Sequence, residues 1–534
     1  MEGLKPREGP SSEETGVVGM NGDREIAGGE GSGIGGPAAV EVLKGCLEEL
    51  NVQVRIYVPG YPITKAVPAL GEGAEMATNE KVALEVALGS SASGRRAIVL
   101  VKHLGINLLA DPLAIAPTHT IGAGLVVLAG EDVGPRGSQA EMDVRNYGPL
   151  CEVPVLDPAS PILLGSALRE AYALSEEVRA PAMVRTTFEF GGGGGVSSRD
   201  PAGFRVPPPP REVGRSPTFD RSIWDLTAKG RHQRYRTEAL PAMRSASEGS
   251  SLNLLRGGGG DIGIIASGRP AGYASKTDLP LLVVGFSHPL PLEAIREFVS
   301  EHDKILVAEE PTPFIEARLM VCGGIFGKLT CHLPWGRMAA GDLARAIEMI
   351  GSGEEPGPAQ KPERSEDRAA SKKVCDDCPY RPLYEAVFGL RVPVAGDAGC
   401  SIRAVRDPPA VDVVYGLGSS VAVASGFGEK GVALIGDYAI AHSGLLGLID
   451  AVNNRREVLV LLLDNGVAAM TGGQGVPDLS PVLRTIVPDA RTIDLPEDRG
   501  DIEELLAEEL AKPGVSLVVA RGRCPRYAAI PIPK

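Results

Sequence analysis

The strongest constraint on the fold comes from two apolar runs that end in polar residues. Val432–Ile435 leads into Asp437, and Val458–Leu463 leads into Asn465. Between them, residues 442–454 carry apolar side chains at helical spacing. A helix joining two buried strands predicts a β-α-β crossover, which brings both strand ends to the carboxyl edge of a parallel sheet. Ligands of open α/β sheets bind at that edge, so the pattern predicts a ligand site there.

The residues at these strand ends suit a metal-bound phosphate. Asp437 and Asn465 offer the oxygen ligands that Mg²⁺ prefers. Gly436 permits the close approach of a diphosphate, and the start of the following helix supplies amide donors. Glycine-aspartate and aspartate-asparagine pairs are also common turn residues, so the spacing alone leaves an ordinary pair of turns open.

The sequence segments around these residues resemble those of a known protein family. GDYAIAHSGLLGLIDAVNN and LLLDNGVAAMTGGQG closely resemble the matching stretch of indolepyruvate:ferredoxin oxidoreductase alpha subunits, thiamine-diphosphate enzymes of the 2-oxoacid:ferredoxin oxidoreductase superfamily. The resemblance covers about residues 50–190 and 262–525. It implies an α/β protein with three doubly wound parallel-sheet domains of the transketolase and pyruvate ferredoxin oxidoreductase-like type. It also implies that Asp437, Asn465 and the Val467 carbonyl hold Mg²⁺ beside thiamine diphosphate and Gly436.

Thiamine diphosphate needs a second protein half, because a carboxylate near its aminopyrimidine must promote loss of the reactive proton. MATNEKVALEVALG resembles the pyrimidine-binding segment of the same family, which makes Glu80 the activating carboxylate. Glu85 follows five positions later on the same expected helix. Since that is roughly 140° around the helix, both cannot be expected to face the site.

Three further segments resemble substrate-side elements of the family. In PGYPIT the resemblance implies that Thr64 meets the oxoacid carboxylate, although an ordinary proline-glycine turn is the alternative. In VKHLGIN, Lys102 and His103 would offer a cation or proton relay, and His103 is equally compatible with a packed, hydrogen-bonded histidine. The segment GSQAEMDVRNYG implies a structural role at the cofactor interface for Gln139, Asp143 and Arg145.

Four of the eight cysteines share the C-terminal region: Cys375, Cys378, Cys400 and Cys524. Soft thiolates in this number suit an iron–sulfur cluster or a structural zinc. Related pyruvate oxidoreductases hold a cluster with a similar pattern, so the resemblance implies a 4Fe-4S cluster, while zinc or unliganded thiols stay open. The remaining cysteines are expected to be small buried hydrophobic residues: Cys46, Cys151, Cys322 and Cys331.

Length and composition set the domain plan. A chain of 534 residues exceeds one hydrophobic core. Apolar-poor, Gly-, Pro- or charge-rich stretches mark a disordered tail, an insert and a linker. The predicted order is a tail (1–36), a pyrimidine-binding domain (37–189), an insert or linker (190–260), a middle α/β domain resembling the transketolase C-terminal domain (261–350), a linker (351–372) and a diphosphate- and Mg-binding domain with the cysteines (373–534).

Charge and hydropathy exclude other classes of protein. The net charge is −14 and no basic block is present, which argues against a nucleic-acid partner. No apolar run approaches the roughly 20 residues that span a bilayer, and the acidic N-terminus lacks the layout of a signal peptide. A cytoplasmic protein without a membrane partner is therefore expected.

The activity implied by the resemblance is oxidative decarboxylation of a 2-oxoacid, indolepyruvate or another aryl pyruvate, with coenzyme A, to acyl-CoA and reduced ferredoxin. Expected partners are ferredoxin or a smaller gamma- or beta-type subunit, in a dimer or heterotetramer. The long form of the family continues into a ferredoxin module, whereas this sequence stops at Lys534. Alternatives are a non-oxidative thiamine-diphosphate decarboxylase or carboligase, and a non-catalytic subunit.

Overall fold

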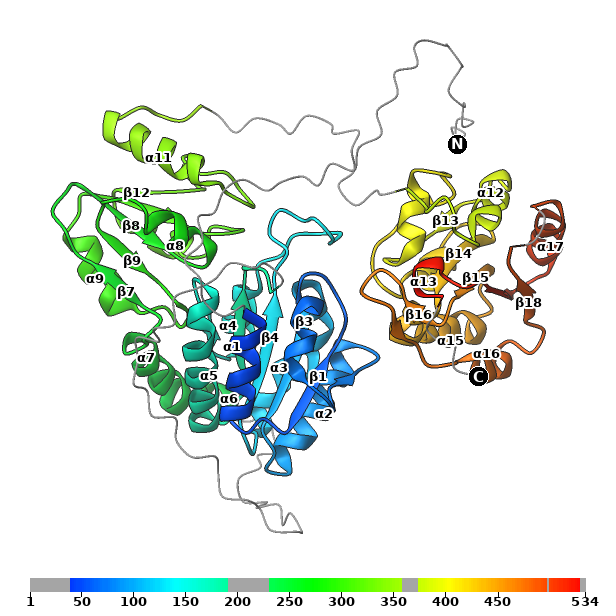
Figure 1. The fold of residues 1–534 in the computed structure, drawn as a ribbon, viewed down its shortest axis with the longest axis horizontal. Helices are drawn as coiled ribbons and strands as arrows, with labels where there is room; N and C mark the ends of the chain where they lie inside the picture. Colours follow the sequence, from blue (N-terminus) through cyan, green and yellow to red (C-terminus); the bar gives the residue numbers. More distant parts are fainter. Residues whose placement is uncertain (1–38, 191–229, 358–372, 497–498, 529–534) are drawn as a thin grey trace.

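The computed structural model describes residues 39–190, 230–357, 373–496 and 499–528, which form three units that each contain a largely parallel sheet (Figure 1). We call them the first, middle and third domains. The α/β class is thereby confirmed. The expected tail at 1–36 lies outside the described residues.

The first domain contains seven strands in the order β10-β5-β6-β4-β3-β1-β2, and only the β10–β5 pair is antiparallel. Its central strands consist almost entirely of buried aliphatic residues, as expected for a parallel sheet covered on both faces. The strands are β1 Val54–Tyr57, β2 Glu75–Met76, β3 Ala97–Lys102, β4 Leu125–Gly130, β5 Val155–Leu156, β6 Ala182–Thr186 and β10 Phe286–His288. The main helices are α1 Ala39–Glu49, α2 Glu80–Ala92, α3 Ile106–His119, α4 Tyr147–Cys151 and α5 Leu164–Val178.

The segment expected to be an insert at 190–260 contains helices in its C-terminal part. Residues 191–229 lie outside the described residues, but the chain then forms α6 Arg231–Arg234, a π-helical turn Tyr235–Ala239, and α7 Leu240–Glu248. Met243 and Leu252 are fully buried and join the core of the first domain. The sequence missed these helices because their apolar positions are few and become meaningful only against that core.

The middle domain has the strand order β12-β11-β8-β9-β7, with β7 antiparallel to β9. Successive residues of its strands enter two separate cores, one with α8 and α11 and the other with α9 and α10, so helices cover both faces. Its elements are β7 Leu254–Arg256, β8 Ile262–Ala266, α8 Arg269–Ala274, β9 Leu281–Val283, α9 Leu292–Ser300, β11 Lys304–Ala308, α10 Glu316–Leu319, β12 Ile325–Phe326 and α11 Ala340–Ser352. Of the expected linker at 351–372, residues 358–372 lie outside the described residues.

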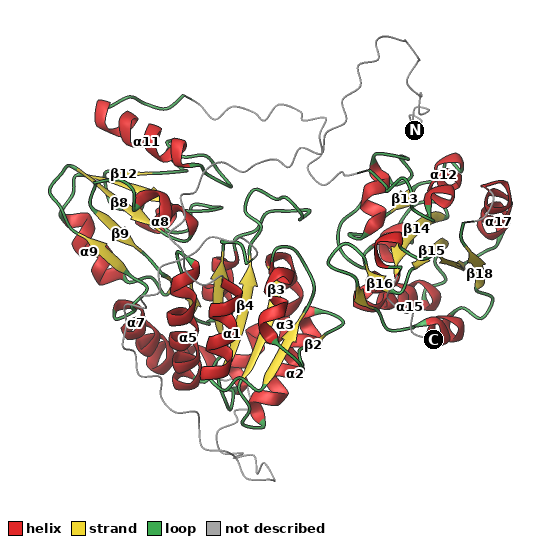
Figure 2. Ribbon diagram, in the orientation of Figure 1, coloured by secondary structure: helices red, strands yellow, loops and turns green. Residues whose placement is uncertain are grey.

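The third domain is wholly parallel in the order β13-β14-β15-β19-β18. Helices α12 and α17 cover one face, and α13, α15 and α16 cover the other (Figure 2). The predicted crossover is confirmed, since β14 pairs in parallel with β15 through α15. The elements are α12 Arg381–Gly389, β13 Val394–Ala395, α13 Ser420–Ala424, β14 Gly431–Gly436, α14 Asp437–Ala439, α15 Leu445–Asn453, β15 Val458–Asp464, β16 Val467–Ala468, β17 Gln474–Gly475, α16 Ser480–Ile486, β18 Arg491–Asp494, α17 Arg499–Ala511 and β19 Val515–Arg521.

The first and third domains meet where α2 begins. Asn79 Nδ2 donates to the backbone carbonyl of His442 at 2.8 Å. Met76 packs against a small apolar cluster that includes Tyr438 and Ala468. The start of α2 therefore lies at the carboxyl edge of the third sheet. No helix within the described ranges is both long and apolar enough to cross a membrane.

Candidate functional site at the junction of two domains

Glu80 is the first residue of α2 and is buried at this junction. Asn79 caps the helix by accepting the backbone N–H of Val82 at 2.9 Å, which fixes where the helix starts. Glu80 is 6% exposed, and its Oε2 lies 2.9 Å from His442 Nε2. Glu85 instead has a side chain that is 47% exposed and pairs with Lys81. Of the two glutamates, only Glu80 faces the third domain.

His442 is a site residue that the sequence reasoning missed. Ser443 Oγ donates to the Leu417 carbonyl at 2.8 Å, so its own proton is committed. The 3.0 Å contact between His442 Nδ1 and Ser443 Oγ therefore assigns a proton to Nδ1. The 2.9 Å contact between Nε2 and Glu80 Oε2 then links the two side chains across the domain junction. The available signal was a histidine in an otherwise apolar helical segment.

Two glycines make room for the charged groups of this junction. A Cβ at Gly105 would lie 2.2 Å from Glu80 Oε1, and a Cβ at Gly60 would lie 2.8 Å from Lys102 Cδ. Burial lowers the pKa of Lys102, while the negative charges of Asp132 and Glu80 act in the opposite direction. The structure therefore brings the PGYPIT, NEK and KHLG segments together around Glu80.

Thr64 and His103 already have protein partners. Thr64 Oγ1 accepts from Gly60 N at 2.8 Å and donates to the Gly60 carbonyl at 3.0 Å, which closes the PGYPIT loop. His103 is 1% exposed, with Nε2 lying 3.1 Å from the Ala140 carbonyl and Nδ1 lying 3.4 Å from Asp132 N. Burial lowers the pKa of His103, which favours a neutral ring. These contacts are structural, and the substrate roles of both residues stay predictions.

Asp437 lies at the carboxyl end of β14, as the crossover requires. Its carboxylate accepts the backbone N–H groups of Tyr438 at 2.7 Å, Asn465 at 3.0 Å and Gly466 at 2.5 Å. Burial raises the pKa of Asp437 to about 7, and the nearby charge of Asp464 adds to this effect. A carboxylate has about four acceptor positions, so one is left for a cation, whose charge would offset the cost of burial.

The remaining residues of the predicted cradle surround Asp437. Asn465 Oδ1 accepts from Val467 N at 3.0 Å, which shapes the loop after β15. A Cβ added at Gly436 would meet nothing within 4 Å, so space is open beside the start of α14. No three His, Cys, Asp or Glu side chains are placed to hold one metal ion in the described part of the chain. The expected Mg²⁺ site includes only one such side chain, and its other ligands are an amide, a carbonyl and phosphate oxygens.

Tyr438 supplies an unpaired buried hydroxyl at the same junction. Its side chain is packed against Met76 and Ala468, and its Oη has no hydrogen-bond partner among the described residues. Burial raises its pKa, and the charge of Glu80 raises it further. Leaving such a group unpaired costs about 1–3 kcal/mol. A ligand with a hydrogen-bonding atom near Glu80 would remove that cost.

Asp397 also escaped the sequence reasoning. It is fully buried and accepts the Gly418 N–H at 2.9 Å with both carboxylate oxygens. Gly418 has a φ of 82°, and a Cβ there would lie 2.1 Å from Ser443 Oγ. Asp397 therefore holds the Gly416–Ser420 turn against Ser443 and, through it, orients His442. The glycines of that turn were the available signal.

The four C-terminal cysteines lie close enough in the third domain for their charges to interact. Burial raises the pKa of Cys400 to about 12, and the charges of Cys378, Cys524 and Cys375 add to the effect. The four thiols therefore occupy one neighbourhood. Cys46 and Cys151 are buried as expected. The expectation for Cys322 and Cys331 was wrong, because both are exposed in the loops that follow α10 and β12.

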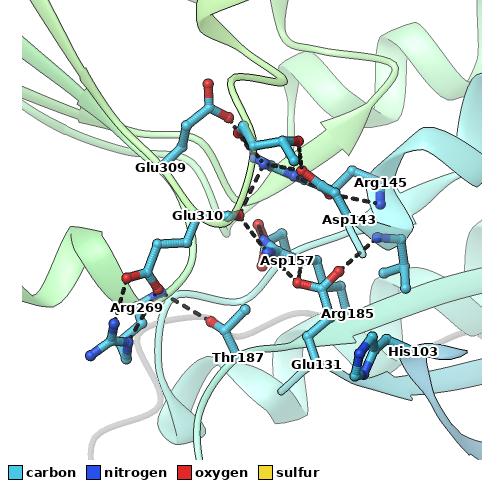
Figure 3. Close-up of polar contacts among 12 residues, drawn as sticks. His103, Glu131, Asp143, Arg145, Asp157, Arg185, Thr187, Arg269, Glu309 and Glu310 are labelled. Carbon is cyan, nitrogen blue, oxygen red and sulfur yellow. Dashed lines mark hydrogen bonds and ion pairs between the residues drawn. The ribbon is translucent and has the colours of Figure 1, made fainter. Parts of the chain in front are cut away.

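The expectation for Asp143 and Arg145 is also corrected. Arg145 is fully buried, and its guanidinium binds Asp143 and Glu309, together with the carbonyls of Glu310 and Thr312 (Figure 3). These partners belong to the first and middle domains. The two residues thus join those domains, whereas the contacts that form the candidate cofactor site lie between the first and third domains. Gln139 is exposed.

Comparisons with known proteins agree with this geometry. Residues 411–519 match the family described as "Thiamine pyrophosphate enzyme, C-terminal TPP binding domain". The indolepyruvate oxidoreductase subunit IorA of Methanothermobacter marburgensis is 33% identical over 469 residues, covering 81% of this chain and 75% of that protein. The subunit IorA of Methanothermobacter thermautotrophicus is 30% identical over 76% of this chain and 69% of its own length. That of Archaeoglobus fulgidus is 28% identical over 89% and 84%, respectively. The similarity therefore extends well beyond the third domain.

Proposed function

The chain belongs to the family of the indolepyruvate oxidoreductase subunit IorA, and on that basis we propose that it catalyses thiamine-diphosphate-dependent oxidative decarboxylation of a 2-oxoacid. The proposed substrate is indolepyruvate or another aryl pyruvate, the product is its acyl-CoA, and the electrons pass to ferredoxin. The observation that carries the proposal is the contact between Glu80 of the first domain and His442 of the third.

This contact supports the proposal, because it holds the Glu80 carboxylate at the junction of the first and third domains, where thiamine chemistry would need a carboxylate. When bound, thiamine diphosphate supplies a nucleophilic carbon and an electron sink for decarboxylation. Glu80 would exchange a proton with the aminopyrimidine, and His442 would hold that proton on the protein side. The buried Tyr438 hydroxyl and the open space beside Gly436 both fit a ligand that bridges the two domains.

The strand ends of the third domain supply the rest of the proposed cofactor site. Asp437, Asn465 and the Val467 carbonyl would hold Mg²⁺ against the diphosphate. On the substrate side, Lys102 lies near Glu80 and would attract the oxoacid carboxylate, with Thr64 and His103 shaping the adjacent loops.

The cysteine set fits a cluster that accepts single electrons. The negative charges of Cys378, Cys524 and Cys375 all raise the pKa of Cys400, which supports one shared neighbourhood for the four thiols. Zinc has no redox chemistry, whereas the proposed reaction needs a group that accepts electrons. We therefore propose a 4Fe-4S cluster rather than a single zinc ion.

Partners and location are also proposals. Coenzyme A and a 2-oxoacid would be the small-molecule substrates. Ferredoxin or a smaller gamma- or beta-type subunit would take the electrons, within a dimer or heterotetramer in the cytoplasm. The reaction class requires an electron acceptor, which supports this part of the proposal.

The proposal is tested on protein purified anaerobically with any co-purifying subunit. We expect about four irons per chain and an electron paramagnetic resonance signal when indolepyruvate, thiamine diphosphate, Mg²⁺ and coenzyme A are added. Glu80→Gln should abolish that substrate-dependent signal, while Glu85→Gln, at an exposed site on the same helix, should retain it. A protein that binds thiamine diphosphate and decarboxylates the oxoacid without iron would contradict the oxidative assignment and favour the non-oxidative alternative. Absence of thiamine diphosphate binding would favour a non-catalytic subunit.

A further inference from the structure

Two buried donors without partners lie beside the four C-terminal cysteines. Tyr384, in α12, is 1% exposed, and its Oη has no hydrogen-bond partner in the described part of the structure. The Nε atom of Arg403, in the 3₁₀ helix Cys400–Val405, is also buried and has no hydrogen-bond partner among the described residues. Among the described residues, only five buried side-chain nitrogen or oxygen atoms lack a hydrogen-bond partner. Two of the five lie near the same cysteines, and buried polar groups without partners are rare enough to need an explanation.

Both donors belong to side chains that lie near the thiols, and Cys378 packs against the core that contains Tyr384. Arg403 Nη1 donates to Cys375 Sγ at 3.5 Å, which places the guanidinium beside the CxxC pair. Burial raises the pKa of Tyr384, and the charges of Cys400 and Cys378 raise it further. The remaining surroundings of Tyr384 are apolar, since it belongs to the core that α12 forms with α17.

The protein alone gives these donors little to bind. An unpaired buried donor costs about 1–3 kcal/mol, and a thiol sulfur is only a weak acceptor. The thiolates and sulfides of an iron–sulfur cluster carry negative charge and accept several hydrogen bonds, which is one of the ways proteins set a cluster's reduction potential.

We infer that Tyr384 Oη–H and Arg403 Nε–H donate hydrogen bonds to sulfur atoms of a cluster held by Cys375, Cys378, Cys400 and Cys524, and thereby raise its reduction potential. The inference rests on the cluster in the proposed function. Oxidation of one 2-oxoacid would release two electrons, which the cluster would accept and pass to ferredoxin one at a time, gaining one negative charge with each electron. Hydrogen-bond donors and a guanidinium charge stabilise the more negative, reduced state.

The test is a potentiometric titration of the anaerobic protein followed by electron paramagnetic resonance. Tyr384→Phe removes only the hydroxyl, and Arg403→Lys keeps the positive charge but removes the Nε donor together with the Nη1 donor to Cys375 Sγ. We expect the ratio of reduced to oxidised cluster at a fixed applied potential to fall several-fold in Tyr384→Phe and about tenfold, or ~59 mV, in Arg403→Lys. The matched control is Tyr380→Phe, because Tyr380 is buried in the same core but its hydroxyl donates to the Gly522 carbonyl at 2.9 Å. The control should leave the potential unchanged.

Metal content and apoprotein stability separate this inference from the proposed function. Wild-type protein without iron, or with zinc in its place, would remove the cluster and both proposals that depend on it. If Tyr384→Phe and Arg403→Lys contain as much iron as the wild type and their clusters have the wild-type reduction potential, the inference is overturned. The cluster itself would then remain part of the proposed function. Loss of iron from these variants, with an unchanged melting temperature of the apoprotein, would support the contacts. Since Tyr384→Phe removes an unpaired hydroxyl, the apoprotein should be at least as stable as the wild type.

Discussion

Gly105 shows how a residue without a side chain can determine the chemistry of this site. Its Cα lies so close to Glu80 that a Cβ would come within 2.6 Å of the carboxyl carbon. The end of a glutamate side chain can ordinarily move away, but the Glu80 carboxylate is held by His442. Any side chain at position 105 therefore competes with the contact between Glu80 and His442.

Gly105→Ala should consequently reduce activation of the cofactor more than it reduces stability. We expect at least a tenfold loss in the rate of C2-proton exchange of bound thiamine diphosphate, measured by NMR, with a stability loss of about 1–2 kcal/mol from the displaced carboxylate. The matched control is Gly89→Ala, since a Cβ there meets nothing within 4 Å and alanine should stabilise α2 by roughly 0.5–1 kcal/mol. Equal effects of the two substitutions would contradict the role given to Gly105.

Asp437 and Asp464 provide a second comparison at the residue scale. Asp437 follows β14 and Asp464 is the last residue of β15, but only Asp437 accepts the backbone amides of Asn465 and Gly466. Asp464 is paired with Arg521 at 3.7 Å instead. Asp437→Asn should weaken Mg²⁺-dependent binding of thiamine diphosphate by about 100-fold or more in isothermal titration calorimetry, because a neutral amide binds Mg²⁺ poorly. Asp464→Asn should change the affinity only a few-fold. Binding by Asp437→Asn with the wild-type affinity would remove Asp437 from the metal site.

At the scale of elements, β10 is the least predictable strand of the first sheet. It follows β9 of the middle domain in sequence, yet it pairs antiparallel with β5 of the first domain. His288 ends this strand, with its Nε2 3.2 Å from Tyr235 Oη. Burial, together with the charge of Arg318, lowers the pKa of His288 to about 4 from its ordinary value of 6.5. The strand therefore brings a neutral histidine into the seam between two domains.

This histidine makes the seam sensitive to acid. The unfolded chain binds a proton at His288 near pH 6.5 and the folded chain only near pH 4, so protonation favours unfolding as the pH falls through that window. The contribution is about 3 kcal/mol between neutral pH and pH 4. Between neutral pH and pH 4, the free energy of unfolding measured by urea denaturation should fall by about 3 kcal/mol less in His288→Gln than in the wild type. His232→Gln, at a side chain that is 80% exposed, is the control. Identical acid profiles for His288→Gln and the wild type would refute this assignment.

At the scale of the whole molecule, buried ion pairs connect the first and middle domains. Arg185 binds Glu131 and Asp157, and its Nη2 donates to the Glu310 carbonyl at 2.6 Å (Figure 3). Although burial opposes ionisation of Asp143, Arg145 lowers its pKa to about 2. A buried network of this kind depends on every member, because loss of one partner leaves an uncompensated charge.

Arg145→Met should therefore destabilise the junction by about 3–5 kcal/mol, measured as a shift in chemical denaturation followed by circular dichroism. The control is Arg491→Met, which breaks an exposed pair with Glu508 whose side chains are 49% and 55% exposed. Arg491 also lies 3.7 Å from the buried Glu509, so a second control, Lys373→Met, breaks an ion pair with Asp407 whose two side chains are both exposed. That change should cost less than about 1 kcal/mol. A cost for Arg145→Met as small as that of the control would show that the network contributes little to domain docking.

The sequence by itself determined the class of the fold and the position of the crossover. The strands at 431–436 and 458–464 and the helix at 445–453 between them lie where the apolar pattern predicted them. These features are local, because strand burial and helix periodicity are set by residues close together in the chain. The same local chemistry placed Asp437 and Asn465 at one sheet edge.

Only the tertiary structure decided which buried groups meet. Glu80 and His442 are separated by 362 positions, and Arg145 and Glu309 by 164. Their pairing depends on which domain surfaces pack together, and spacing along the chain carries no information about that. For the same reason, the sequence did not reveal that Arg145 and Asp143 lie at the seam between the first and middle domains rather than at the expected cofactor interface. A buried polar group must find its partner wherever the fold places one.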